Sequence, residues 1–255
     1  MRNRPFLLCL ATMCLSAVVA LGDIGPFPAH RPRPQPSPVP SAPRTETELP
    51  TLDESTQIEM QSADVNVVLK PSTKSGRQTS ILAEVTCNFQ LHCIAARLAT
   101  SRYTMSCPYA TEGDRGPKCK RFSVEIDGKR SGSVREARWS AENGGNKPPE
   151  YVGYAWPTAI DRGATQTVTV KYSLLLPVTE NTSAFTYILC TGASWRRPIG
   201  RETVRVRAES GLQIAPVRSR NLRPTAQTKK DLIWELKDFV PKEDIHVEVT
   251  RDDKR

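Results

Sequence analysis

Between Ile81 and Leu91 the chain reads Ile-Leu-Ala-Glu-Val-Thr-Cys-Asn-Phe-Gln-Leu, in which apolar and polar residues alternate. Every second residue from Ile81 is apolar or a cysteine, and Glu, Thr, Asn and Gln fill the positions between them from residue 84 onward. Successive side chains of a β-strand point to opposite faces. The alternation therefore predicts a strand with one face in a core and the other in water.

The same period of two recurs along the chain. Ala63-Asp-Val-Asn-Val-Val-Leu69 repeats it, and Asp127-Gly128 follows a third apolar run with the residues of a tight hairpin turn. Pro177 ends another run. Further candidate strands are residues 122–126, 168–176, 185–190, 203–208, 232–236 and 245–249. Many short strands separated by turns predict an all-β fold, either an antiparallel β-sandwich or two stacked β-units.

Helix is predicted at most in two short stretches, Gln90 to Thr100 and Val134 to Ala141, and neither has strong apolar spacing. From residue 131 to 150 the composition turns to Gly, Ser, Asn and Pro. This segment is predicted to be a linker or long loop between an N-terminal β-unit, 56–130, and a C-terminal β-unit, 151–250. Residues 251–255 form a charged tail.

The first 22 residues have the layout of a secretory signal peptide. Arg2 and Arg4 precede an apolar run from Phe6 to Leu21, and small residues surround the expected cleavage point after Gly22. The alternative, a retained membrane anchor, needs roughly 20 apolar residues. No second long apolar segment follows. The mature protein is therefore expected to be exported, periplasmic or extracellular, and without a transmembrane segment.

Residues 23–55 are rich in proline and nearly devoid of periodic apolar residues. Such a segment buries too little surface to offset its ordering entropy, and proline favours an extended conformation. We expect a disordered spacer that tethers the β-sandwich.

Removal of the signal peptide leaves an odd number of cysteines in an oxidising compartment, namely Cys87, Cys93, Cys107, Cys119 and Cys190. Cys107 and Cys119 flank a turn-rich stretch from Pro108 to Pro117, so a disulfide between these two is predicted, and the pairing of the other three is left open. No two of them have the Cys-x-x-Cys spacing of a zinc site. The sequence predicts no metal and no cofactor.

Charge is distributed unevenly. Between Thr191 and Lys230 ten Lys or Arg residues face two acidic residues, so this segment carries +8 of the chain's formal +9. Arginines alternate with valines there, which on a strand places the arginines on the solvent face. The predicted anion-binding residues are Arg196, Arg197, Arg201, Arg205 and Arg207.

Such a row attracts an anionic envelope polymer or membrane surface. The alternative is an ordinary solvated face. Nucleic acid is disfavoured as a partner, because aromatic side chains are not interleaved with the arginines.

Catalytic patterns are weak. His92 follows a strand and is the candidate base for Cys87 or Cys93, but no sequence element places a third, orienting group. His246 alternates with apolar residues and is expected on the surface. Nucleophile-elbow, phosphate-loop and zinc-protease motifs are absent. The sequence favours a non-enzyme that acts as an interaction or structural module of the cell envelope. The alternative is an extracytoplasmic hydrolase acting on glycans.

Two elements of the second half carry a family resemblance. They are Tyr187-Ile-Leu-Cys-Thr-Gly-Ala-Ser-Trp-Arg-Arg-Pro-Ile-Gly200 and Phe239-Val-Pro-Lys-Glu-Asp-Ile245. The chain resembles the secreted bacterial family known as domain of unknown function 4424, over roughly residues 60 to 250 and most closely in the second half. The resemblance implies a secreted β-domain. It implies no reaction, because that family has no established activity.

Trp195 stands in a turn bracketed by Gly192 and Gly200, with Pro198 restricting the backbone. We expect it to plug one end of the sandwich. The alternative is an exposed aromatic that stacks on a ligand.

Overall fold

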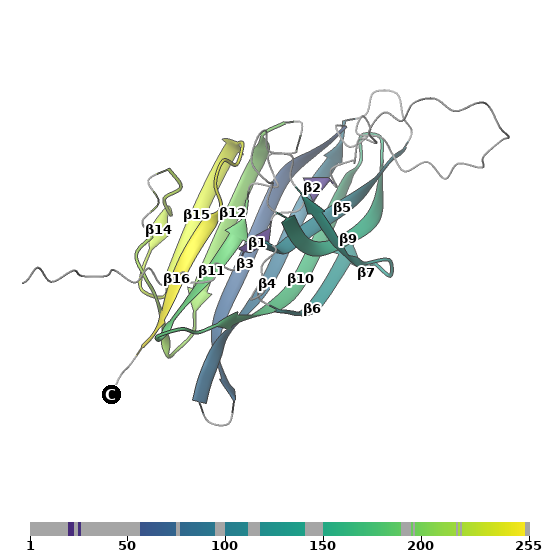
Figure 1. The fold of residues 1–255 in the computed structure, drawn as a ribbon. Coiled ribbons are helices and arrows are strands. Elements are labelled where there is room, and N and C mark those ends of the chain that lie inside the picture. The colour runs from purple at the N-terminus through teal and green to yellow at the C-terminus, as the bar shows by residue number, and fades with distance from the viewer. Residues whose placement is uncertain are drawn as a thin grey trace, which may run out of the picture.

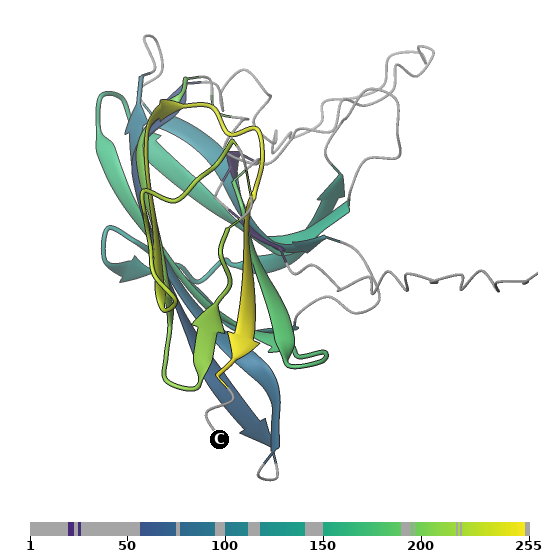
Figure 2. The ribbon, with the colours of Figure 1, turned by 90° about the vertical axis from the view of Figure 1, so that its left-hand side faces the viewer.

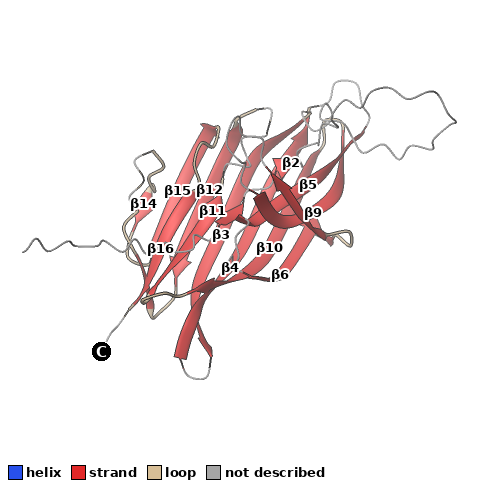
Figure 3. Ribbon diagram, in the orientation of Figure 1, coloured by secondary structure: helices blue, strands red, loops and turns tan. Residues whose placement is uncertain are grey.

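The computed structural model describes residues 20–22, 25–26, 57–74, 77–94, 100–111, 118–140, 150–189, 195, 197–217, 219 and 221–252. Within these ranges it consists of strands and turns without helix (Figure 3), which confirms the all-β prediction. The two stretches considered for helix are corrected. Gln90 to Cys93 continue a strand, and residues 135–140 form a strand of their own.

A central eight-stranded sheet crosses the molecule (Figure 1). Its strands, in spatial order, are β14 (Ala226–Gln227), β15 (Asp231–Phe239), β12 (Ile199–Ala208), β3 (Ile58–Lys74), β4 (Arg77–Cys93), β10 (Thr165–Pro177), β6 (Lys118–Ile126) and β7 (Lys129–Arg130). Neighbours run antiparallel except β12 and β3, which are parallel. The predicted hairpin turn joins β6 to β7, with Asp127 and Gly128 both at positive φ.

Two four-stranded sheets complete the sandwich. One is ordered β1 (Ala20–Gly22), β11 (Thr182–Ile188), β16 (Ile245–Arg251), β13 (Leu212–Ile214). The other is ordered β2 (Gly25–Pro26), β5 (Thr100–Thr111), β9 (Glu150–Asp161), β8 (Arg135–Ser140). Figure 2 shows β15 and β16, the last two strands of the chain, in different layers, although only a short turn separates them in sequence.

The predicted alternation of β4 is confirmed. Alternate side chains from Ile81 to Cys93 are at most 2% exposed, whereas Glu84, Asn88 and Gln90 face solvent. β3 follows the same pattern from Ala63 onward. One extra residue, Gln61, interrupts its pairing with β4. The central sheet thus has one apolar face, which packs into the core, and one polar outer face.

An aromatic cluster joins the central sheet to β9. The Phe122 ring stacks on Tyr154 with ring centroids 4.1 Å apart, and it also lies 6.0 Å from the ring of Tyr172 and 6.2 Å from that of Trp156. Aromatic pairs at such distances contribute about 0.5–1.5 kcal/mol each beyond the burial of their area. The cluster fixes β9 over β6 and β10.

The predicted bridge between Cys107 and Cys119 is not formed. Cys107 lies on β5, whereas Cys119 lies on β6 of the central sheet, so the turn-rich segment connects two sheets rather than the arms of one loop. The Cys119 thiol donates to the carbonyl of Arg121 at 3.5 Å, and burial raises its pKa to about 11. Cys190 lies outside the described residues.

Cys87 and Cys93 lie on one strand and on the same face. A strand advances about 3.3 Å per residue. The two thiols are therefore too far apart to bond, and no disulfide occurs among the described cysteines.

The N-terminal region differs from expectation at two short strands. β1 holds the last three residues of the predicted signal peptide and pairs in parallel with residues 186–188. β2 lies in the predicted disordered spacer, and its Gly25 and Pro26 pair with Ser106 and Met105. The remaining residues of the predicted spacer lie outside the described part of the chain.

Strands from both predicted β-units share the central sheet, because β10 pairs with β4 on one side and with β6 on the other. The predicted linker, residues 131–150, contains the strand β8. β12 passes close to β3 at Gly200, where an added Cβ would lie 2.6 Å from the carbonyl oxygen of Gln61. A glycine at this position lets the parallel pair form.

Candidate functional site

The predicted basic row lies on the outer face of β12. Arg201 and Arg207 are exposed and Arg205 is half-buried, whereas Val204 and Val206 face the core. The alternation along β12 therefore has the direction expected from the sequence. Arg197 lies just before the strand and is exposed, and Arg196 falls outside the described residues.

Carboxylates from neighbouring segments meet three of these arginines. Arg205 donates to both carboxylate oxygens of Asp64 on β3, at 3.1 and 3.0 Å. Arg197 contacts Glu59 at 2.9 Å. Each of these pairs places a negative charge beside a positive one, which reduces the local potential of the row.

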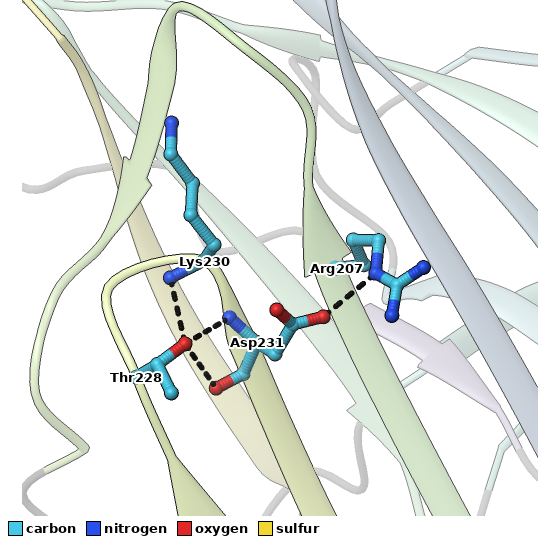
Figure 4. A network of polar contacts seen from close by, with 4 residues as sticks. All are labelled: Arg207, Thr228, Lys230 and Asp231. Carbon is cyan, nitrogen blue, oxygen red and sulfur yellow. Dashed lines mark hydrogen bonds and ion pairs between the residues drawn. The ribbon is translucent and has the colours of Figure 1, made fainter.

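Arg207 is paired through the turn that precedes β15. Its Nε donates to the carboxylate of Asp231 at 2.7 Å (Figure 4). The Thr228 hydroxyl accepts hydrogen bonds from the backbone N–H groups of Lys230 and Asp231, which fixes the turn that carries the carboxylate. The Arg207 side chain is 71% exposed, so water screens this pair.

Arg201 differs from its neighbours. It lies directly opposite Lys237 of β15, and both side chains are exposed. Neither forms an ion pair with a described residue. Directly opposite residues of an antiparallel pair have Cβ atoms about 5 Å apart, and like charges there are destabilising. Among the described arginines of the row, Arg201 is thus the one without a described counter-charge, and it faces a second cation, Lys237.

Glu202 lies between Arg201 and Thr203 but points into the core, and it is fully buried. Burial raises the pKa of its carboxyl to about 8, and the neighbouring Tyr187 hydroxyl offsets part of the rise. Glu202 has no ion pair within the described part of the chain. Its carboxyl is therefore held protonated at neutral pH.

A second charged region is a groove of about 460 Å³ beside β11 and β16. Its apolar wall includes Val217, Leu222 and Trp234. Its acidic residues are Glu243, Asp244 and Glu248, and its described lining contains no lysine or arginine. The charged side chains of its described lining are therefore all carboxylates.

Hydrogen bonds order the polar side of the groove. The Thr186 hydroxyl lies 2.8 Å from Nδ1 of His246, its cross-strand partner. The Ser219 hydroxyl donates to Glu243 at 3.3 Å. Trp234 Nε1 donates to the Leu222 carbonyl at 3.3 Å, which holds the loop that forms the apolar wall.

Sequence reasoning missed both Glu202 and the groove. Glu202 shares its strand parity with Val204 and Val206, so the alternation along β12 already indicates that it faces the core. The groove combines the 215–222 segment with β16, and no local pattern brings these together. His246 is exposed, as predicted.

His92 does not face the thiols that it was considered to serve. It lies on the outer side of β4 and its Nδ1 is 3.4 Å from the Thr165 hydroxyl, whereas Cys87 and Cys93 face the core. Trp195 is 6% exposed, which favours the predicted structural plug over an exposed stacking aromatic.

Comparison with known proteins supports the fold. No family model matches the chain, and no curated protein matches it in sequence. Its structure is similar to that of a candidate nutrient binding protein from Legionella pneumophila, at 17% identity and a TM-score of 0.58, over 92% of this chain and 72% of that one. It also matches an M1 zinc metallopeptidase from Deinococcus radiodurans, at 13% identity and a TM-score of 0.35, over 77% of this chain and 42% of that one.

The described residues contain no helix that is long and apolar enough to cross a membrane. Within the described part of the chain, no group of three or more His, Cys, Asp or Glu side chains could hold a metal ion.

Proposed function

We propose that this chain is an exported binding module of the bacterial envelope, and that Arg201 and Lys237 form its contact with phosphate groups of anionic lipid. The signal-peptide layout of residues 1–22 and the resemblance to a secreted domain family support export. The Legionella protein named for nutrient binding shares the fold, and its name is consistent with a binding rather than a catalytic role.

The observation that carries the proposal is the contrast within the basic row. Arg205 and Arg207 have carboxylate partners, whereas Arg201 and Lys237 face each other without one among the described residues. An anion between the two side chains would relieve their repulsion and gain two charge-assisted contacts. The proposed contact therefore consists of two cations on neighbouring strands, Arg201 of β12 and Lys237 of β15, and not of the whole basic row.

Vesicle co-sedimentation of the full chain tests the proposal. Binding to vesicles containing phosphatidylglycerol is compared with binding to neutral phosphatidylcholine vesicles, at low and high salt. A basic residue near an anionic membrane contributes about 1 kcal/mol, so Arg201→Ser with Lys237→Ser should weaken binding about 30-fold. Added salt should weaken wild-type binding as screening increases.

The matched control is Arg205→Ser with Arg207→Ser, which removes the same net charge from the same face. We expect it to weaken binding less than about threefold, because these arginines are already paired. Equal losses in the two double variants would show that net charge alone governs adhesion. No loss in either would place the contact elsewhere, and both outcomes would overturn the proposal.

The alternative function, hydrolysis of glycans, is favoured by one observation, the carboxylates that line the groove. Glycosidases act through a pair of carboxyl groups about 5–9.5 Å apart on either side of the scissile bond. Release of reducing sugar from a polysaccharide by the wild type but not by Glu248→Gln would support this alternative.

A further inference from the structure

The two ends of the central sheet differ in how far their outermost long strand is covered. At one end, β14 pairs with β15, and the Thr225 hydroxyl accepts a hydrogen bond from the Glu235 N–H at 3.1 Å. At the other end, β7 pairs with the last two residues of β6 (Figure 1). The Ser131 N–H donates to the Val124 carbonyl at 2.8 Å, and the chain then continues to β8 in another sheet. The described pairing of β6 on this side thus ends at Val124.

The backbone of Phe122 faces the same side as that of Val124. In an antiparallel sheet, the N–H and C=O of one residue point to one neighbouring strand, and those of the next residue point to the other. Phe122 lies two residues before Val124, and the register with β10 is continuous between them. Because the Val124 carbonyl faces Ser131, the N–H and C=O of Phe122 point outward as well. They present one donor and one acceptor to a further strand.

A groove of about 490 Å³, called here the β6 groove, lies along this edge. Its described lining consists of Lys120, Arg121, Phe122, Ser123 and Glu125 of β6 and Arg130 of β7. Consecutive side chains of a strand point to opposite faces, so a hollow that touches residues 121, 122 and 123 together lies against the edge of the strand. This is the position that the next strand of the sheet would occupy, in line with β7.

Basic side chains border the β6 groove. Lys120, Arg121 and Arg130 are exposed, and none forms an ion pair with a described residue. The Glu125 carboxylate accepts from Lys171 of β10 at 3.1 Å, so its charge already has a partner. Arg130 lies directly opposite Glu125, and Arg121 precedes Glu125 by four residues in one register. Both arginines therefore lie on the outer face of the sheet beside the groove.

These charges distinguish between two kinds of occupant. Two copies of this chain joined edge to edge would bring their basic side chains together, and like charges across strands are destabilising. Charged side chains on an edge strand commonly oppose such self-pairing. An acidic extended segment would instead gain main-chain hydrogen bonds from the edge and charge-assisted contacts from the arginines. We propose that the edge of β6 binds an extended acidic peptide segment of a partner protein as an additional strand of the central sheet.

The geometry of a strand specifies the pattern of that segment. Carboxylates at every second position would share the outer face with Arg121 and Arg130, and the residues between them would lie on the side of Phe122. This contact is separate from Arg201 and Lys237, which lie on β12 and β15 toward the other end of the sheet. Either proposal can therefore fail without the other.

Fluorescence anisotropy of a labelled peptide, Thr-Glu-Thr-Glu-Thr-Glu-Thr, titrated with the full chain tests the inference. Replacing every Glu of the peptide by Gln should weaken binding at least about tenfold, because the charge-assisted contacts are lost. Two further peptides keep the charge but carry N-methyl groups on the amides of either the Thr or the Glu residues. Since alternate amides face opposite edges of a strand, one methylated peptide should lose about tenfold in affinity and the other should bind as the parent does.

Arg121→Ser with Arg130→Ser should weaken binding of the parent peptide about tenfold. The matched control is Arg223→Ser with Lys229→Ser, which removes two exposed positive charges near β14. It should leave binding within about twofold, because charges separated by more than a Debye length are screened. Unchanged melting temperatures of both double variants show that a loss is local.

Four results would each overturn the inference. They are no binding by the folded wild type, equal binding of the Glu and Gln peptides, full binding of both methylated peptides, and equal losses in the two double variants. Full binding of both methylated peptides would mean that the basic residues attract an anion of any backbone without strand pairing.

Discussion

The two faces of β12 place ionisable side chains in opposite environments. On the outer face, Arg205 and Arg207 remain in contact with water and pair with carboxylates of neighbouring segments. On the inner face, Glu202 is fully buried beside Val204 and lacks a cation among the described residues. One step along the strand therefore changes the cost of a charge from nearly nothing to several kcal/mol. A count of charged residues along the sequence therefore does not reveal which of them reach the surface.

The largest expected effect comes from adding a second carboxyl group to the inner face. Val204→Asp would place a carboxylate among the apolar side chains of the core, since Val204 is fully buried. We expect the free energy of unfolding to fall by about 5 kcal/mol or more, because an unpaired buried charge loses its hydration. Yield of folded protein and chemical denaturation measure this loss.

Gln90→Glu is the control for this prediction, because Gln90 is exposed on the outer face of β4 and lies opposite the uncharged residues Ser62 and Thr167. It should change the free energy of unfolding by less than about 0.5 kcal/mol. If the two variants were equally stable, the inner face of β12 would be open to water, contrary to the burial of Val204.

The next effect concerns the pH dependence of stability. The folded state holds the Glu202 proton up to about pH 8, whereas the unfolded chain releases it near pH 4.5. Between these values the folded state binds more protons, so the free energy of unfolding falls as the pH rises. At 1.36 kcal/mol per unit of pKa, the free energy of unfolding falls by roughly 5 kcal/mol across this interval.

Glu202→Gln should remove this slope and exceed the wild type in stability at pH 8, with a smaller difference at pH 5. Urea denaturation at a series of pH values measures both. A wild-type and a variant curve with the same slope would mean that the Glu202 carboxyl is ionised in the folded protein, contrary to its burial.

The smallest effect is expected on the outer face. Arg205→Ser removes a partly exposed ion pair with Asp64, and such pairs contribute about 0.2–1 kcal/mol. The variant should melt within a few degrees of the wild type, and raising the salt concentration should narrow the gap. A loss as large as that of Val204→Asp would show that the Arg205–Asp64 pair supports the junction of β12 and β3.

Local sequence patterns predicted much of the fold. The alternation from Ile81 to Leu91, the hairpin at Asp127-Gly128 and the strand end at Pro177 each reflect rules that act within a few residues, and the structure confirms all three. The prediction of a Cys107–Cys119 disulfide was wrong, because the turn-rich sequence between two strands does not indicate which sheet each strand joins.

The order of apolar and polar residues is enough to predict that the chain forms strands and which face of each strand is apolar, because a strand repeats every two residues and burial follows that repeat. Which strands pair, and which side chains therefore meet, follows from the tertiary fold. The parallel pairing of β12 with β3 brings Asp64 to Arg205, and the packing of two sheets buries Glu202 beside Tyr187. These contacts join residues far apart in the chain, so they depend on the order of strands in the sheets, which no local period encodes.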